Sequence, residues 1–193
     1  MRDTTKEMLA FVREMDKMKG ILRANMMLDG SRHEDDAQHS WHASIIAMLL
    51  ADEAGPDVDI DRAIKMLLVH DIVEVDAGDT YAYDEKGYED KEEREQRAAD
   101  RLFPMAGRVG AMMRELWEEF EACQTPTAQY AAAIDRLQPL WGNFWVDGKV
   151  WKENNITLAK VQKRNEVTVK ALPQIWRETE EMLDEALEKG YLL

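Results

Sequence analysis

The chain has 193 residues, of which 25 are Lys or Arg and 39 are Asp or Glu, so its formal net charge is −14. This length suits one domain with a sizeable core, whereas so acidic a chain lacks the cationic face that binds a nucleic acid polymer. The longest apolar stretch, Ala43–Ala51, is about half of the roughly 20 residues that cross a bilayer, so we expect no membrane span.

Apolar residues recur at three- and four-residue spacing along most of the chain, which predicts an all-α fold. The first helix is expected over Thr5–Lys19, with Gly20 at its end and with Met8, Leu9, Val12 and Met15 on one face. A connection follows over Arg23–Asp36 and contains the turn signal Asp29-Gly30-Ser31.

The second helix is expected to run from Asp36 to about Ala54, where Gly55-Pro56-Asp57 stops it, and it carries His39 in its first turns. Asp59 or Asp61 is a suitable cap for the third helix. That helix is predicted over Arg62–Val75, and because it is apolar on nearly all sides it belongs in the centre of a bundle.

Gly78-Asp79-Thr80 ends the third helix, and a polar loop is expected from there to about Asp90. Further helices are predicted over Lys91–Leu102 and over Ala106–Ala122, the latter with Met112, Leu116 and Phe120 facing inward. Another is expected from about Pro126 through Asp135, and the last covers Thr157–Lys189 with an interruption near Pro173. The aromatic residues Trp117, Phe120, Trp141, Phe144, Trp145 and Trp151 suit a core or a subunit contact better than base stacking.

The adjacent pair His70-Asp71 closes the apolar run Ala63–Val69. An ionised carboxylate in such surroundings must be paired or metal-bound, because an isolated buried charge is too costly. His39 and Asp135, each on another predicted helix, are candidates to complete a site. Adjacent helical side chains diverge by about 100°, so the sequence leaves open whether the four converge. Two His and two Asp without a thiolate favour Mn, Fe, Co, Ni or Zn.

Four segments in this order resemble the motifs of HD-domain metal-dependent phosphohydrolases, above all the 5′-deoxynucleotidase-like branch: Arg32–His42, Lys65–Glu74, Ala77–Thr80 and Ala133–Leu137. The resemblance extends over about residues 19–176 and implies one HD-type helical domain over 1–193. It also implies that His39, His70, Asp71 and Asp135 bind one divalent transition metal, and that the reaction is hydrolysis of a nucleoside 5′-monophosphate or a similar small phosphomonoester by a metal-activated water.

By the same resemblance Glu74 and Asp79 are catalytic candidates. Glu74 follows His70 by four residues, on the same helical face, and is placed to orient or deprotonate the attacking water. Asp79 is a candidate to contact the sugar or to protonate the leaving oxygen. The alternatives are a solvated acid at the helix end for Glu74 and a residue that shapes the Gly78 turn for Asp79.

Arg23 and Arg32 are the candidates for binding phosphate, since a guanidinium can hold phosphate oxygens in a bidentate way. Arg23 is the stronger candidate, and Ala24 stands after it where the characterised deoxynucleotidases have Trp. Arg32 could instead pair with Glu34 or Asp36 and stabilise the loop. His42, one turn after His39, is expected to support the site rather than to bind the metal.

Two other functions compete with phosphomonoester hydrolysis: hydrolysis of a nucleoside triphosphate or cyclic nucleotide, and a catalytically silent binding protein stabilised by its metal. The single cysteine, Cys123, cannot form an internal disulfide, and the first residues are charged where a secretory signal is apolar. A cytoplasmic location is therefore expected. The resemblance and the aromatic content also favour a homodimer.

Overall fold

The computed structural model describes residues 4–193 and is predominantly helical, as the periodicity of the sequence predicted. The elements of the first half are α1 (Thr4–Met15), β1 (Leu22–Met26), β2 (His33–Asp35), α2 (Asp36–Leu49), α3 (Ile60–Val69), α4 (Glu74–Ala77) and α5 (Lys91–Leu102). Those of the second half are α6 (Gly107–Ala122), α7 (Pro126–Trp145), α8 (Lys149–Glu153), α9 (Leu158–Arg164), α10 (Glu166–Ala171) and α11 (Pro173–Glu188).

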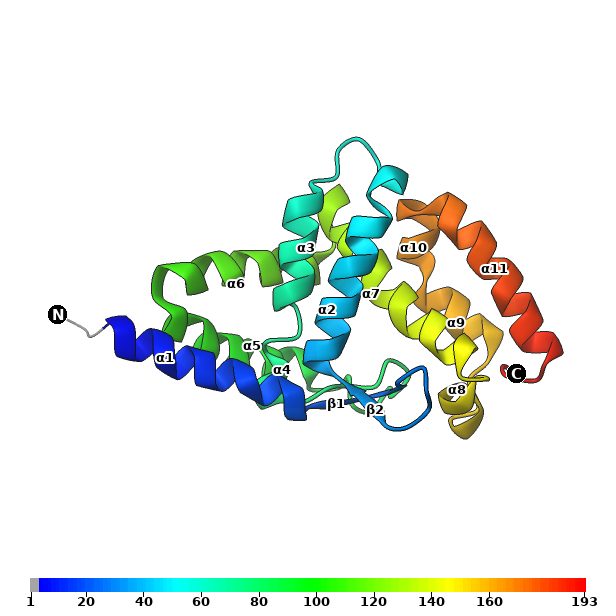
Figure 1. Cartoon of the computed structure of the whole chain (residues 1–193), viewed down its shortest axis with the longest axis horizontal. Helices are drawn as coiled ribbons and strands as arrows, with labels where there is room; N and C mark the ends of the chain where they lie inside the picture. Colours follow the sequence, from blue (N-terminus) through cyan, green and yellow to red (C-terminus); the bar gives the residue numbers. More distant parts are fainter. Residues whose placement is uncertain (1–3) are drawn as a thin grey trace.

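Helix α7 occupies the centre of the molecule (Figure 1) and contacts α2, α3, α6 and α10. Helices α1, α5 and α6 lie to one side of it, whereas α8 to α11 lie to the other. The larger apolar core is formed mainly by α2, α3, α5, α6 and α7, and a smaller one joins the end of α7 to the C-terminal helices. Over residues 4–193, no helix is long and apolar enough to cross a membrane.

Local signals in the sequence account for several helix starts. Asp35 caps α2, since its carboxylate accepts a hydrogen bond from Gln38 N at 2.9 Å and the Gln38 side chain accepts one from Asp35 N. Asp59 caps α3 through Arg62 N, and Thr125 caps α7, whose first residue is Pro126. These caps fix where the helices that carry the candidate ligands begin.

The connection predicted over Arg23–Asp36 contains two short antiparallel strands, β1 and β2, that the sequence did not reveal. They pair Leu22 with Asp35 and Met26 with His33, and the predicted turn at Asp29-Gly30-Ser31 lies between them. Gly30 has φ 68°, a conformation that favours glycine. The hairpin places Arg23 beside the start of α2.

The predicted helix over Arg62–Val75 is divided into α3 and α4, and His70 to Val73 form a tight turn between them. The predicted helix over Thr157–Lys189 consists of three helices, with breaks at Asn165 and before Pro173. The polar loop before Asp90 and the helix Lys91–Leu102 are confirmed.

The exposure of two helices bears on their predicted faces. Met8, Leu9 and Val12 of α1 are 59 to 64% exposed, whereas Met15 of the same predicted face packs against the larger core. Met112 is 46% exposed, although Leu116 and Phe120 are buried as predicted. The buried face of α6 includes Gly110, where an added Cβ would lie 1.7 Å from the carbonyl oxygen of Phe103. Trp117 and Phe120 are buried on the same side of α6 as Gly110, and Met112 lies outside that side.

Candidate metal centre

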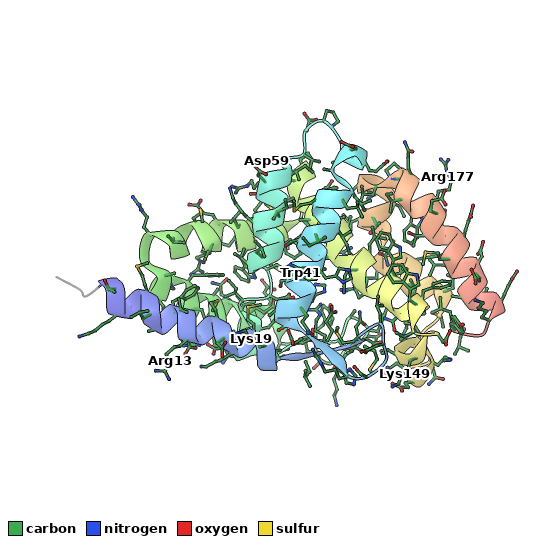
Figure 2. All side chains as sticks on the ribbon, in the orientation of Figure 1. Arg13, Lys19, Trp41, Asp59, Lys149 and Arg177 are labelled. Carbon is green, nitrogen blue, oxygen red and sulfur yellow. The ribbon has the colours of Figure 1, made fainter. Side chains whose placement is uncertain are left out.

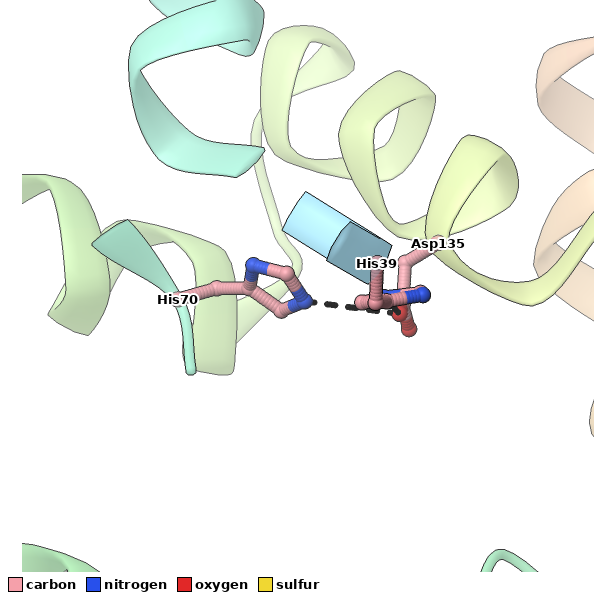
Figure 3. Close-up of side chains that lie close together, drawn as sticks. All are labelled: His39, His70 and Asp135. Atoms are coloured by element: carbon pink, nitrogen blue, oxygen red, sulfur yellow. Dashed lines mark hydrogen bonds and ion pairs between the residues drawn. The ribbon is translucent and has the colours of Figure 1, made fainter. Parts of the chain in front are cut away.

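The four candidate ligands converge at the centre of the molecule. The Nε2 atom of His39 lies 3.0 Å from Oδ1 of Asp135 and 3.9 Å from Oδ2 of Asp71. The Nε2 atom of His70 lies 3.1 Å from Oδ1 of Asp71 and 3.4 Å from Oδ1 of Asp135. Figure 3 shows His39, His70 and Asp135, with the ring of His70 directed towards the carboxylate of Asp135.

Each ligand comes from a different element or from a helix end. His39 is on the first turns of α2, Asp135 is on α7, and His70 and Asp71 follow the last residue of α3. Because the chain leaves α3 as a tight turn at this point, the adjacent side chains of His70 and Asp71 reach the same space. This resolves the divergence that a continuous helix would have imposed on them.

Hydrogen bonds fix which nitrogen of each imidazole faces the cluster. The Nδ1 atom of His70 lies 2.9 Å from the carbonyl oxygen of Leu67, which can only accept, so Nδ1 carries the proton. The Nδ1 atom of His39 lies 2.9 Å from Oε1 of Gln138. The amide nitrogen of Gln138 donates to the Glu34 carboxylate at 2.9 Å, which turns its oxygen towards His39. Both Nε2 atoms are thereby directed at the carboxylates.

This donor set fits a divalent metal. All four side chains are at most 13% exposed, and Nε2 of His70 is a buried polar atom without a hydrogen-bond partner. Two imidazole nitrogens with a fixed tautomer and two carboxylates suit a first-row divalent ion. His39, His70 and Asp135 each offer a ligand atom within 4.8 Å of the others, and Asp71 adjoins them.

The electrostatics of the cluster show ionised carboxylates beside a cationic imidazole. Burial would lower the pKa of His70, but Asp71 and Asp135 raise it to about 9. Burial would likewise raise the pKa values of Asp71 and Asp135, but the neighbouring imidazoles hold both below their usual range. The acids around His70 therefore favour positive charge at this position.

A second acidic group surrounds Arg23, whose Nη1 atom lies 2.6 Å from Oδ2 of Asp71 and 3.3 Å from Oδ1 of Asp36. The same nitrogen lies 3.8 Å from Asp79 and 3.9 Å from Glu74. Burial would lower the pKa of Arg23, but Asp71, Glu74 and Asp79 raise it well above the ordinary value. The structure thus brings three predicted residues, Arg23, Glu74 and Asp79, to one place beside the candidate ligands.

Glu74 and Asp79 flank a glycine that ends α4. Glu74 is the first residue of α4, and its Oε2 atom is buried without a hydrogen-bond partner. Gly78 follows with φ 75° and ψ 152°, a conformation that L residues rarely adopt, and it directs the chain so that Asp79 lines a cavity next to Arg23. Burial raises the pKa of both carboxyl groups.

Arg32 is the one predicted site residue that the structure does not bring to the cluster. Its side chain is 50% exposed, it donates to the carbonyl oxygen of His33 at 2.9 Å, and it lies 3.8 Å from Asp35. Arg32 thus contacts its own loop, as the alternative expected, but its acidic neighbour is Asp35 rather than Glu34 or Asp36. His42 accepts a hydrogen bond from the Gln138 amide at 3.2 Å and does not reach the ligands, in agreement with a supporting role.

The sequence reasoning missed Gln138, Glu34 and Asp36. Gln138 lies three residues after Asp135 on α7, so helical spacing could have indicated that it shares the face of that ligand. Asp36 packs against Arg23 with no exposed surface, and burial together with Asp71 raises its pKa to about 7. Glu34 precedes α2 and carried no signal, because its contact with Gln138 spans 104 positions of sequence.

The fold and the cluster together define an all-α domain built around a His-Asp pair and two further ligands from other helices. The chain belongs to the HD domain family, whose model matches residues 15–176. This match confirms the family that the four motifs indicated.

A crystal structure of a predicted metal-dependent phosphohydrolase from Magnetospirillum magnetotacticum MS-1 is 45% identical, with a TM-score of 0.92 over 97% of this chain and 95% of that one. The human 5′-deoxynucleotidase HDDC2 is 25% identical over 135 residues, which are 69% of this chain. The chain matches 65% of the length of that human protein. The 5′-deoxynucleotidase hdd1 of Schizosaccharomyces pombe is 26% identical over 74% of both chains.

Proposed function

We propose that the protein is a metal-dependent phosphohydrolase that releases phosphate from a nucleoside 5′-monophosphate or a similar small phosphomonoester. The observation that carries the proposal is the convergence of His39, His70, Asp71 and Asp135 around one buried point, next to Arg23 and two further acids. The names of the human, yeast and Magnetospirillum relatives support the same reaction class.

In this proposal His39, His70, Asp71 and Asp135 hold one divalent ion from the set Mn, Fe, Co, Ni and Zn. Such an ion, when bound, supplies Lewis-acid chemistry: it makes a water more acidic and neutralises charge on the phosphoryl oxygens. Gln138 and the carbonyl group of Leu67 hold the two imidazoles in the orientation that this requires.

Glu74 is the proposed general base. Burial and the charge of Asp71 raise the pKa of Glu74 well above the ordinary value, which makes its carboxylate a stronger base. It takes a proton from the attacking water as the water oxygen bonds to phosphorus and the bond from phosphorus to the leaving oxygen breaks. Asp79, which lines the cavity beside Arg23, is the proposed acid that gives a proton to that leaving oxygen.

Arg23 is the proposed phosphate-binding residue. Its guanidinium is held between the carboxylates of Asp71 and Asp36 and lies within 4 Å of Glu74 and Asp79. It can offer its remaining N–H groups to the phosphoryl oxygens, where charge increases during the reaction. Arg32 has no role in this proposal.

The proposal is tested by metal analysis together with phosphate release from a panel of nucleotides. We expect His70→Ala to lose both metal and activity. Glu74→Ala should keep the metal and lose activity, whereas the exposed Glu115→Ala should keep both. Metal binding without release from any substrate would indicate a silent binding protein, and release from triphosphates or cyclic nucleotides alone would indicate the other hydrolase chemistry.

We further propose that one domain over 1–193 forms a cytoplasmic homodimer. Helix α2 carries an exposed apolar face, with Trp41 63%, Ile45 43%, Met48 58% and Leu49 78% exposed. Trp41 is labelled on α2 in Figure 2. The residues repeat at helical spacing, so they share one side of α2, and contiguous apolar surface of this kind is typical of protein contacts.

A further inference from the structure

A cleft leads away from Arg23 and Asp79 towards the C-terminal helices. Its inner part is a cavity of about 50 Å³ whose walls include Arg23, Asp79, Tyr81, Arg136, Asn143 and Arg164. It adjoins an open groove of about 640 Å³, and Tyr83, Arg136 and Arg164 line both spaces. Arg23 and Arg164 therefore line one cavity, and Arg164 also lines the groove beside it.

Helix α7 contributes two neighbouring faces to this region. Asp135 and Gln138 point to the histidines, whereas Arg136, Leu140 and Asn143, spaced by four and three residues, line the cleft. One rigid helix therefore holds a candidate ligand and a cationic cleft residue at adjacent positions. Arg136 is half-buried, and its Nη1 atom donates to the carbonyl oxygen of Arg164 at 2.7 Å, which ties α7 to α9.

Two buried polar atoms of residues that line the cavity have no hydrogen-bond partner. They are the hydroxyl oxygen of Tyr81 and Oδ1 of Asn143. Buried polar atoms in folded proteins nearly always have hydrogen-bond partners. Unpaired polar atoms in a cavity wall therefore indicate a ligand that supplies those partners. A hydroxyl group and an amide oxygen suit the sugar and base of a nucleotide.

The outer part of the cleft is cationic in a chain of net charge −14. Arg136 and Arg164 line it together with Lys160 and Lys163 of α9. Within residues 4–193, none of these four side chains lies within 4.0 Å of a carboxylate, although most other arginines form ion pairs. Glu85 is the acidic residue of the groove wall. Four cations without acidic partners around one cleft favour an anionic ligand.

We propose that this cleft binds a second phosphate group of the substrate, so that the substrate class is a nucleoside bisphosphate rather than a simple monophosphate. The inference rests on the proposed function for the position of the reacting phosphate at Arg23. The sugar and base then contact Tyr81 and Asn143, and the second phosphate meets Arg164 and the lysines of α9. Guanidinium groups favour phosphate because they offer paired N–H donors.

The test is calorimetric binding of adenosine 3′,5′-bisphosphate and adenosine 5′-monophosphate to the Glu74→Ala protein, in which turnover is not expected. We expect the bisphosphate to bind at least about tenfold more tightly. Arg164→Gln should remove that preference, and Arg164→Lys should restore part of it. Lys160→Gln with Lys163→Gln, a pair of exposed substitutions, should reduce the preference about fivefold.

The matched control is Lys170→Gln with Arg177→Gln, which removes two exposed positive charges outside the cleft; Arg177 is labelled on α11 in Figure 2. The control should keep the full preference. Equal affinity for the two ligands, or a preference that survives Arg164→Gln or disappears in the control, would overturn the inference. Preferential binding without phosphate release by the wild type would support the inference and refute the hydrolase. Phosphate release by the wild type without a preference for the bisphosphate would support the hydrolase and refute the inference.

Discussion

Substitution of Gln138 is the most specific test of the candidate metal centre, because Gln138 contacts both the candidate ligand His39 and the buried Glu34 without being a ligand itself. Its oxygen accepts from Nδ1 of His39 at 2.9 Å, and its amide nitrogen donates to Glu34 at 2.9 Å. Gln138→Leu keeps a similar volume but removes these two hydrogen bonds and the longer one to Nδ1 of His42 at 3.2 Å. His39 then loses the contact that fixes its tautomer, and Glu34, which is 5% exposed, keeps a buried carboxylate with no donor from Gln138.

The size of both effects follows from these contacts. A hydrogen bond between neutral groups contributes about 1 kcal/mol and one to a charged group about 1.5–3 kcal/mol, so the free energy of unfolding of the metal-free protein should fall by roughly 2–4 kcal/mol. Loss of a partner that orients a ligating histidine typically weakens metal binding by about 10–100-fold. Urea unfolding measures the first quantity, and competition with a fluorescent chelator measures the second.

Gln129→Leu on the same helix is the matched control for Gln138→Leu. Gln129 donates one hydrogen bond, 3.3 Å long, to the carbonyl oxygen of Cys123, so its loss should cost about 1 kcal/mol or less and leave metal affinity unchanged. If Gln138→Leu binds metal as tightly as the wild type or the Gln129 variant, the hydrogen bond does not orient His39 as we infer.

Three further predictions follow from other parts of the structure. The pKa of His70 is raised to about 9 in the metal-free protein, and metal binding needs the neutral ring. Metal affinity should therefore rise with pH up to about 9. A metal affinity that does not change between pH 6 and 9 would contradict this reasoning. Trp41→Glu with Ile45→Glu should convert a particle of two chains into a monomer in light scattering, and a wild-type monomer would refute the dimer. Asp35→Ala removes the cap of α2 and should lower the free energy of unfolding by about 1 kcal/mol, with recovery in Asp35→Ser; an unchanged urea midpoint would show that the cap adds nothing.

Much of the fold was predictable because its signals are local. The cap Asp59 and the first-turn Pro126 each act within a few residues, and the structure uses both. Helix α2 begins at Asp36 as predicted, but it ends at Leu49 rather than at about Ala54, before the expected stop at Gly55-Pro56-Asp57. The hairpin of β1 and β2 was missed because its pairing spans a loop and its short strands show no clear alternation. Met112 was wrongly placed because the buried side of α6 includes Gly110, which has no apolar side chain and so gave no signal in the sequence.

The candidate site shows the same difference between residues with local signals and residues that depend on long-range contacts. His39, His70, Asp71 and Asp135 lie in ordered motifs, so the sequence was sufficient to name them, and the structure then brought them together. Residues that act through long-range contacts had no such signal. Arg164 of α9 lines one cavity together with Tyr81 and Tyr83 of the loop after α4, a consequence of tertiary structure that no local pattern records.

The central claim is that four side chains bind one ion, and anomalous diffraction from crystals grown with Mn or Co tests it most directly. We predict one strong peak at roughly 2.0–2.2 Å from Nε2 of both His39 and His70 and from a carboxylate oxygen of both Asp71 and Asp135. A peak at another place, or one of these four side chains turned away from the ion, would contradict the account.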